Sequence, residues 1–292
     1  MSLNALVLER LRGVLKPTWR ANVAAELLGS LVKAVGPRRD VADNNLKMIF
    51  PHLTSDQRRS LINASYKHLV WSIVEFLCLV DEPEQALRWV VDVDGEEYLE
   101  ERKRQDKGIV ILTGHIGNWE LLAAWLICRG YPLVAIVRKP DDNGVAGLLD
   151  KYRTRLGIET IPKGKFLMRQ AVHKIREGAF VGFLADQAGS EKELKLPFMG
   201  KLCYTVGGPA ALSLLTGVQV VPVAMYRLKP FCHKVIVDAP LTPRCDLPRN
   251  QAISVMTEQA NAILEGMILK HPEQWLWFHR RWRLKGTSNV DS

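Results

Sequence analysis

Short apolar runs rich in β-branched residues alternate with longer amphipathic stretches from about residue 90 onward. Such alternation predicts strands connected by helices, and therefore a mostly parallel, buried sheet flanked by helices. The expected fold class is α/β. The predicted strands are 109–112, 133–137, 180–184, 218–225 and 235–237, and the helices between them are 119–128, 144–156, 165–176 and 209–216.

The first 90 residues have a helical pattern instead. Apolar residues between 56 and 79 recur at helical spacing, and Pro83 indicates that this helix stops before it. Residues 3–15 have the same periodicity, and the first 39 residues contain seven basic and two acidic side chains. This segment predicts an amphipathic helix that lies in the headgroup plane of a membrane. The alternative is an ordinary helix whose basic face is solvated.

These patterns divide the 292-residue chain into three parts. We expect a helical N-terminal region over 1–90, which includes the membrane-surface segment, an α/β core over 91–286 and a disordered tail over 287–292. No run of about 18 apolar residues occurs, and charged residues interrupt the apolar stretch near the N-terminus, so we predict neither a transmembrane helix nor a signal peptide. Membrane contact is then expected to be peripheral.

Composition narrows the class of partner. Hydrophobic residues make up 47% of the chain and charged residues 24%, which is typical of a globular protein and excludes a disordered one. The formal net charge of +9 favours an acidic partner, which is nucleic acid, anionic lipid or an acidic carrier protein. The five cysteines have neither zinc-ligand spacing nor a disulfide framework, which favours reduced thiols in a cytoplasmic chain.

Polar side chains follow several predicted strands, which is where open α/β sheets bind ligands. After the 109–112 run the chain continues Thr-Gly-His-Ile-Gly-Asn-Trp-Glu, so His115 stands at a strand end and Glu120 in the first turn of a helix. The helix dipole favours a carboxylate there, and the five-residue step can bring both groups into one cleft. The imidazole can then accept a proton near neutral pH. The alternative is a loop histidine and a glutamate that caps the helix.

Two further strand ends carry candidate residues. Arg138 follows the second strand, where its guanidinium would bind a phosphate or polarise a carbonyl, unless it is simply an exposed arginine. Asp186 and Gln187 follow the third strand. A buried carboxylate at Asp186 would pair with His115 from the opposite side, so Asp186 competes with Glu120 as the residue that orients the imidazole.

Several other motifs are distributed along the chain. They are Asn44-Asn45-Leu46, Phe50-Pro51, Glu75-Phe76, Val137-Arg138-Lys139-Pro140, Asp142-Asn143, Asp186-Gln187, Pro197-Phe198-Met199-Gly200, Gly207-Gly208-Pro209-Ala210 and the stretch from Pro272 to Arg281. A histidine and an acidic residue separated by four positions after a buried strand resemble the lysophospholipid-acyltransferase-like superfamily. With the other motifs, the chain from about residue 25 to 283 looks like the late acyltransferases of lipid A biosynthesis, the lauroyl and myristoyl transferases.

This resemblance implies an O-acyltransferase with a glycerolipid-acyltransferase-like fold at the cytoplasmic face of a bacterial inner membrane. The reaction would move a fatty acyl chain from an acyl carrier protein thioester to a hydroxyl of a lipid A precursor, a membrane glycolipid. His115 is then expected to be the general base, with Glu120 or Asp186 orienting it. No cysteine or serine nucleophile is needed if the acyl group transfers directly, and the sequence contains no ligand cluster, so no metal or cofactor is expected.

Substrate contacts are expected from further residues. Asn118 either donates a hydrogen bond near the base or caps the helix, and Gln187 is expected beside the substrate. Arg280 and Arg281 are candidates for binding lipid phosphates, with the end of a basic helix as the alternative. Burial of an acyl chain gains about 0.8 kcal/mol per CH₂, so we expect an apolar groove. Aromatic residues suited to that groove, or equally to the core, are Trp119, Trp125, Phe183, Phe198, Trp275 and Trp277.

Two other functions compete with this one. An acyl-CoA-dependent glycolipid or lysophospholipid acyltransferase fits the same motifs. A non-catalytic lipid-binding or nucleic-acid-binding protein would share the basic charge, but the intact His115 and Glu120 argue against it. The aromatic residues are not interleaved with basic runs in a recognised nucleic-acid-binding motif, so no nucleic acid partner is expected.

Overall fold

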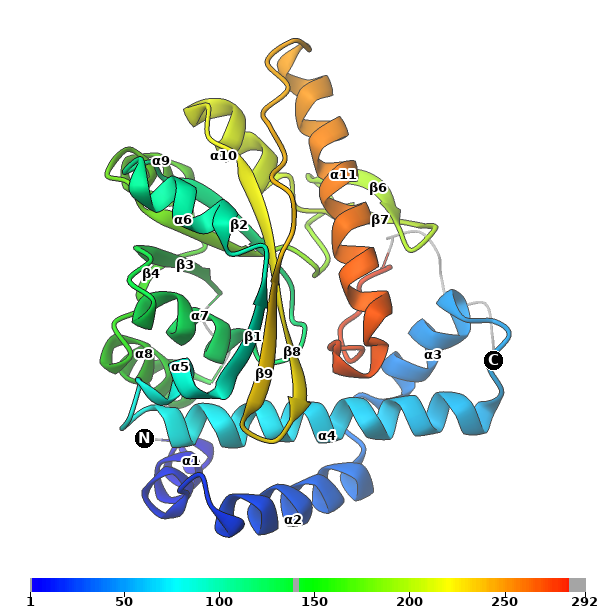
Figure 1. The fold of residues 1–292 in the computed structure, drawn as a ribbon. Helices are drawn as coiled ribbons and strands as arrows, with labels where there is room; N and C mark the ends of the chain where they lie inside the picture. The colour runs from blue at the N-terminus through cyan, green and yellow to red at the C-terminus, as the bar shows by residue number, and fades with distance from the viewer. Residues whose placement is uncertain (1, 139–141, 284–292) are drawn as a thin grey trace.

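In the computed structural model of the chain, residues 2–138 and 142–283 are described, so the predicted tail over 287–292 and the Lys139-Pro140 pair lie outside the described residues. The centre is a seven-stranded sheet in the order β1-β9-β8-β2-β5-β3-β4 (Figure 1). Neighbouring strands are parallel except β8 and β9, which form an antiparallel hairpin. The strands are β1 (Val90–Asp94), β2 (Ile109–Thr113), β3 (Leu133–Val137), β4 (Glu159–Pro162), β5 (Phe180–Leu184), β8 (Val220–Lys229) and β9 (Cys232–Val237). The expected α/β class is confirmed.

The strands that the apolar pattern predicts are all present, and the strands that it misses lie at edges. β1 and β4 are the two outer strands of the sheet. Both are partly exposed and contain polar residues, so neither forms the continuous apolar run of a strand buried on both faces. A separate two-stranded hairpin, β6 (Leu194–Phe198) and β7 (Lys201–Thr205), was also not predicted.

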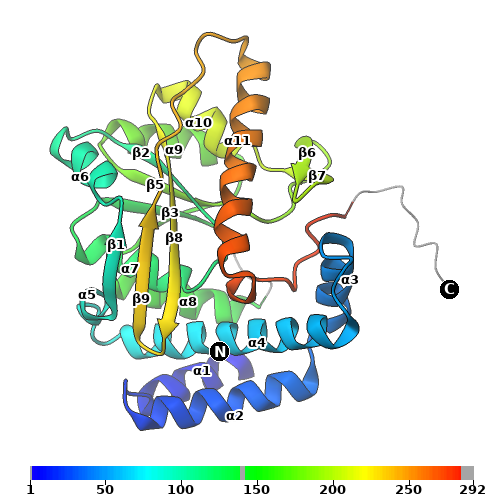
Figure 2. The same cartoon turned by 45° about the vertical axis from the view of Figure 1, so that its right-hand side comes forward.

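Helices cover both faces of the sheet, and α11 stands on the opposite side of the β8–β9 hairpin from α6 (Figure 2). Successive side chains of β2 point to opposite faces, so Ile109 and Ile111 join one apolar core and Val110 and Leu112 join the other. The helices of the first face are α6 (Glu97–Arg104), α7 (Trp119–Cys128) and α8 (Asn143–Arg155), and those of the second are α9 (Leu167–Arg176), α10 (Gly208–Thr216) and α11 (Arg249–Lys270). Of these six helices, α6 and α11 were not predicted.

The N-terminal region is helical, as its periodicity predicts. The longest of its helices, α4, runs across the end of the sheet, and α1 and α2 lie beneath it (Figure 1). None of the helices in the described part of the chain has both the length and the apolar character needed to cross a bilayer. The elements are α1 (Leu3–Val14), α2 (Trp19–Val35), α3 (Arg39–Ile49), α4 (Ser55–Leu79) and α5 (Gln85–Trp89), and a short 3-10 helix η1 (Pro272–Gln274) lies against α4.

A buried ionic cluster joins α4 to the β8–β9 hairpin. Glu75 of α4 is fully buried, and Arg227 of β8 donates to its carboxylate at 2.8 and 3.0 Å. His233 Nε2 lies 3.1 Å from Glu75 Oε1, and Asn118 Nδ2 donates to Oε2 at 2.9 Å. Burial raises the pKa of Glu75, but the charge of Arg227 and the contact with His233 outweigh that effect and hold the pKa well below its usual range. The cluster therefore contains a carboxylate, and Asn118 links it to the loop after β2.

Arg227→Met is expected to lower the free energy of unfolding by about 3–5 kcal/mol, because it leaves the buried Glu75 charge without its main partner. Equilibrium unfolding in urea measures this change. Lys229→Met removes an exposed cation from the same strand and should change stability by no more than about 0.5 kcal/mol. Equal losses in the two variants would contradict a stabilising role for the cluster.

Candidate active site

The loop between β2 and α7 is pressed against the β8 strand. Gly117 has a φ of +57°, and a Cβ there would lie 1.9 Å from the carbonyl oxygen of Met225, so only glycine fits. Its amide donates to the Gln274 carbonyl at 2.9 Å, and its carbonyl accepts from Ser72 Oγ at 2.9 Å. These contacts fix the loop on which His115 stands.

His115 and Asp186 are brought together by adjacent parallel strands. β2 pairs with β5 in register, so the residues that follow their carboxyl ends meet. Asp186 is 2% exposed and accepts three N–H groups: His115 Nδ1 at 2.9 Å, the His115 amide at 2.8 Å and Trp275 Nε1 at 2.7 Å. Burial raises the pKa of Asp186, but the His115 charge and these hydrogen bonds outweigh it and lower the pKa to about 2.

The charge on Asp186 determines which nitrogen of His115 carries a proton. A carboxylate accepts hydrogen bonds, so Nδ1 must be the donor, and in the neutral ring Nε2 keeps its lone pair. Nε2 lies 3.4 Å from Gln187 Nε2. The imidazole packs edge-on against Trp119, with ring centroids 4.9 Å apart. The arrangement can thus take a proton at Nε2 while the Asp186 carboxylate stabilises the imidazolium.

The side chain of Glu120, the other expected partner of His115, contacts Arg153 instead. Its carboxylate accepts from Arg153 Nε at 3.1 Å and forms a second short contact with Arg153 Nη2. Both side chains are about 15% exposed, and the Glu120 charge contributes to a raised pKa of Arg153 despite burial, which lowers it. Of the two carboxylates that the sequence left open, the structure places Asp186 against the imidazole.

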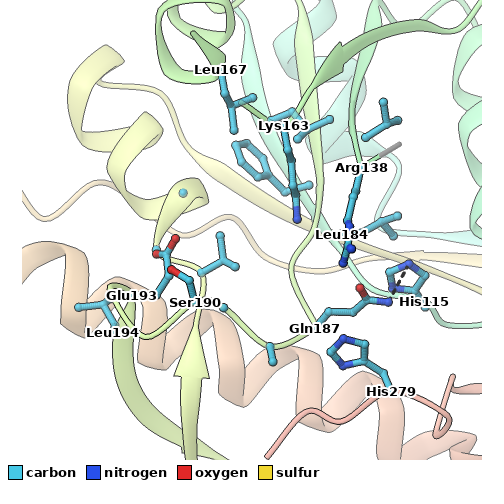
Figure 3. A pocket seen from close by; sticks show the side chains of 18 of the residues that line it. His115, Arg138, Lys163, Leu167, Leu184, Gln187, Ser190, Glu193, Leu194 and His279 are labelled. Carbon is cyan, nitrogen blue, oxygen red and sulfur yellow. Dashed lines mark hydrogen bonds between the residues drawn. The ribbon is translucent and has the colours of Figure 1, made fainter. Parts of the chain in front are cut away.

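A cavity of about 1320 Å³ opens beside His115. Figure 3 shows the side chains of Arg138, Lys163, Gln187 and His279, which line this cavity. Burial and the nearby Arg138 charge lower the pKa of Lys163, and burial lowers the pKa of His279 to about 4. The cavity is basic, because Glu193 is the one acidic residue among its described lining residues and the cationic ones are Arg38, Arg138, Arg153, Lys163, Lys192, Arg280 and Arg283.

A small apolar crevice of about 60 Å³ adjoins this cavity, between α7 and the sheet. The residues that line both spaces are Trp119, Ile136, Val137, Arg153, Phe183 and Leu184. Two of the aromatic residues suggested for an acyl groove, Trp119 and Phe183, are therefore at its entrance. The other four are buried in the core: Trp125, Phe198, Trp275 and Trp277.

Two of the expected substrate contacts have structural partners instead. Asn118 is 1% exposed, and its Oδ1 caps α7 by accepting from the Leu121 amide at 3.1 Å. Arg281 is fully buried and donates to the Tyr204 carbonyl at 2.6 Å and to Thr205 Oγ1 at 2.9 Å. By contrast, Arg280 lines the basic cavity.

Sequence reasoning missed Arg153, Lys192 and Trp275 as parts of the site. Arg153 and Lys192 lie in polar stretches that do not differ in composition from an exposed surface. Trp275 was noted only as a possible groove residue, yet its indole N–H binds the Asp186 carboxylate. A buried tryptophan generally needs an acceptor for its N–H, and that rule is the one signal that pointed toward such a contact.

The fold and the site together define an α/β protein with a histidine–carboxylate pair at a strand end, which is what the acyltransferase resemblance implied. A family model described as bacterial lipid A biosynthesis acyltransferase matches residues 6–284. The chain belongs to this family, and it is an acyltransferase.

Curated relatives agree with this assignment. The chain is 26% identical to the lipid A biosynthesis palmitoleoyltransferase of Escherichia coli (strain K12) over 262 residues, which are 88% of this chain and 83% of that protein. It is 24% identical to the lipid A biosynthesis lauroyltransferase of the same organism over 263 residues, with the same coverage of 88% and 83%. A phosphatidylinositol mannoside acyltransferase of Mycolicibacterium smegmatis is 22% identical over 137 residues, 46% of this chain and 44% of that protein. The expected family and acyltransferase activity are confirmed.

The low pKa of Asp186 should appear in acid stability. A carboxyl group with a pKa of about 2 in the folded protein and an ordinary value when unfolded stabilises the fold above that ordinary value, and this stabilisation is lost as the pH falls toward 2. We therefore expect wild-type stability to decrease more between about pH 5 and about pH 2 than the stability of Asp186→Asn, measured by denaturant unfolding at stepped pH. Glu258→Gln, at an exposed position of α11, should follow the wild type. Parallel profiles for wild type and Asp186→Asn would contradict the assignment.

Proposed function

We propose that this acyltransferase moves a fatty acyl chain from an acyl carrier protein thioester to a hydroxyl of a lipid A precursor, with His115 as general base. The observation that carries the proposal is the pair of His115 with the buried Asp186, which faces a basic cavity that adjoins an apolar crevice. The two spaces match the two halves of the reaction. A phosphorylated sugar suits the basic cavity, and the apolar crevice, at about 60 Å³, would take only the part of the hydrocarbon chain next to the thioester carbonyl.

The proposed reaction passes through a tetrahedral intermediate. His115 Nε2 takes the proton of the acceptor hydroxyl while its oxygen attacks the thioester carbonyl carbon, so a C–O bond forms and the carbonyl becomes an oxyanion. The oxyanion then collapses, the C–S bond breaks, and the leaving sulfur takes the proton from the imidazolium. The products are an ester and a free thiol, and His115 is neutral again. Asp186 holds the ring in position and stabilises the imidazolium.

The cations of the cavity have separate roles in this proposal. Arg138 and Lys163, which converge near His115, stabilise the oxyanion or hold an acceptor phosphate. Arg280 binds acceptor phosphate further out in the same cavity. Gln187, 3.4 Å from His115 Nε2, positions the hydroxyl. Glu120 acts through Arg153, which it fixes where the cavity meets the apolar crevice.

A face of α2 supports peripheral binding to the inner membrane from its cytoplasmic side. Five large apolar residues recur every four positions along this helix and are 46–71% exposed, so they form one stripe on the outside of the protein. The stripe is Trp19, Val23, Leu27, Leu31 and Val35. Lys16 and Arg20 lie at its N-terminal end, where they suit anionic headgroups. A tryptophan at one end is typical of a helix that lies in the interface.

A second candidate acceptor is a different glycolipid, such as a phosphoinositide mannoside. The similarity to a phosphatidylinositol mannoside acyltransferase over about half of each chain favours it. Both acceptors are anionic sugar lipids, so the basic cavity fits both. Mass spectrometry of the acylated product distinguishes them, and a comparison of turnover with acylated carrier protein and with acyl-CoA identifies the donor.

His115→Ala is expected to lower turnover by at least about 10²-fold, because the acceptor hydroxyl loses its base. The purified protein is incubated with an acylated carrier protein and a lipid A precursor, and the acylated lipid is quantified by mass spectrometry. His52→Ala, at an exposed position before α4, should retain wild-type turnover. Turnover by His115→Ala close to that of the wild type would remove His115 from the mechanism.

Paired carboxylate variants separate the two acidic residues in the same assay. Asp186→Asn is expected to lower kcat by at least about 10²-fold and to change its pH profile, because the amide no longer holds the imidazole tautomer. Glu120→Gln should keep the wild-type pH profile, since Glu120 contacts Arg153 instead of His115. An altered profile in Glu120→Gln with an unchanged one in Asp186→Asn would reverse the assignment.

Leu27→Ser combined with Leu31→Ser should weaken binding to vesicles of anionic phospholipid by at least about tenfold, since two leucines no longer enter the apolar layer. Sedimentation with vesicles measures the bound fraction. Leu202→Ser changes a leucine of similar exposure on β7, and its binding should match the wild type. Undiminished binding of the double variant would exclude the α2 stripe as the membrane face.

A further inference from the structure

The outer face of α9 combines an exposed apolar centre with a basic rim. Phe166 is 60% exposed just before the helix, and Leu215 of the neighbouring α10 is 45% exposed. A shallow hollow of about 780 Å³ is lined by both residues and by Arg169, His173 and Arg176 of α9. These three residues are spaced three or four positions apart, so they share one side of the helix. We call this surface, together with Lys165, the α9 patch.

The α9 patch carries net positive charge. Its nearby acidic residues, Glu159 and Glu177, are both paired with Lys174, at 2.9 and 3.3 Å, and Glu177 also lies 3.2 Å from His173. Within the described part of the chain, Arg169 and Arg176 form no ion pair, and both are exposed. An anionic partner would therefore meet guanidinium groups that do not have to give up an internal contact first.

The patch adjoins the basic cavity. Met168 lines both the shallow hollow and the cavity that contains His115, and its neighbour Leu167 lines the cavity. The N-terminal end of α9 follows β4, whose carboxyl end lies at the same sheet edge as those of β2 and β5. A flexible arm attached to a partner on the patch could therefore enter the cavity by passing over Met168.

The patch also lies far from the apolar stripe of α2. Figures 1 and 2 both show α9 and α10 at one end of the molecule and α1 and α2 at the other. A protein attached to a bilayer through α2 would leave the α9 patch facing the aqueous side. A membrane surface and a soluble macromolecule could then bind at the same time without competing.

We propose that the α9 patch docks the acidic carrier protein that presents the acyl thioester. This inference rests on the proposed function, because it places the partner of that same reaction. The negative surface of the carrier meets Arg169 and Arg176, an apolar side chain of the carrier covers Phe166, and its prosthetic arm carries the thioester past Met168 to His115. The charges steer the encounter, so its strength depends on ionic strength.

The test is the double variant Arg169→Glu with Arg176→Glu, assayed with two donors that share one arm. With an acylated carrier protein, KM should rise at least about fivefold, while kcat changes by less than about twofold. With acyl-phosphopantetheine, the same arm without the protein, KM should not change. Lys201→Glu with Lys229→Glu makes the same change in net charge at exposed positions outside the patch, and should leave both KM values unchanged. Added salt should raise the wild-type KM for the carrier more steeply than that of the patch variant.

The outcomes separate the docking surface from the reaction. A wild-type protein that does not use the acylated carrier overturns both the donor in the proposed function and the docking surface. A protein that uses the carrier with the same KM in wild type and patch variant overturns the docking surface alone. Loss of binding to anionic vesicles in the patch variant, with an unchanged carrier KM, would assign the patch to the membrane instead. An equal KM increase for both donors would show that the substitutions disturb the cavity, and would likewise overturn the proposal.

Discussion

A carboxylate almost without access to water must receive hydrogen bonds from the protein, and this requirement organises the site around Asp186. Its three N–H donors come from two segments that are far apart in the sequence, the loop after β2 and the tryptophan after η1. Any displacement of either segment would leave part of a buried charge unsatisfied. The position of His115 is therefore coupled to the packing of both segments.

A second buried carboxylate, Glu75, supports the same loop through Asn118. Glu75 accepts from Arg227 and from Asn118, and Asn118 in turn caps α7. The loop between β2 and α7 thus lies between two anionic centres, each held by N–H donors. This arrangement explains why residues that resemble substrate contacts in the sequence, such as Asn118, are fully enclosed. Their polar groups stabilise the loop between β2 and α7, from which His115 faces the cavity.

Much of the sheet could be predicted because buried parallel strands are continuous apolar runs, and the polar residues after β2 and β5 marked the edge where the site lies. The choice between Glu120 and Asp186 could not be made, because it depends on strand pairing between residues 71 positions apart. The sequence also does not distinguish arginines that line the site from arginines that support the fold. Arg153 resembles an exposed helical arginine in sequence but lies at the site, whereas Arg281 belongs to a basic motif but is buried against β7. Edge strands and the β6–β7 hairpin lack apolar runs, so periodicity does not detect them.

The hydrogen bond from Trp275 to Asp186 spans 89 positions of the chain. During synthesis, β2, β5 and the histidine loop all leave the ribosome well before Trp275 does. Until that residue arrives, Asp186 lacks one of its three donors, and the Gln274 carbonyl that holds Gly117 is absent as well. A nascent chain can therefore form much of its sheet while the His115–Asp186 pair is still incompletely supported, and the geometry of the pair becomes complete only after Trp275 has been synthesised.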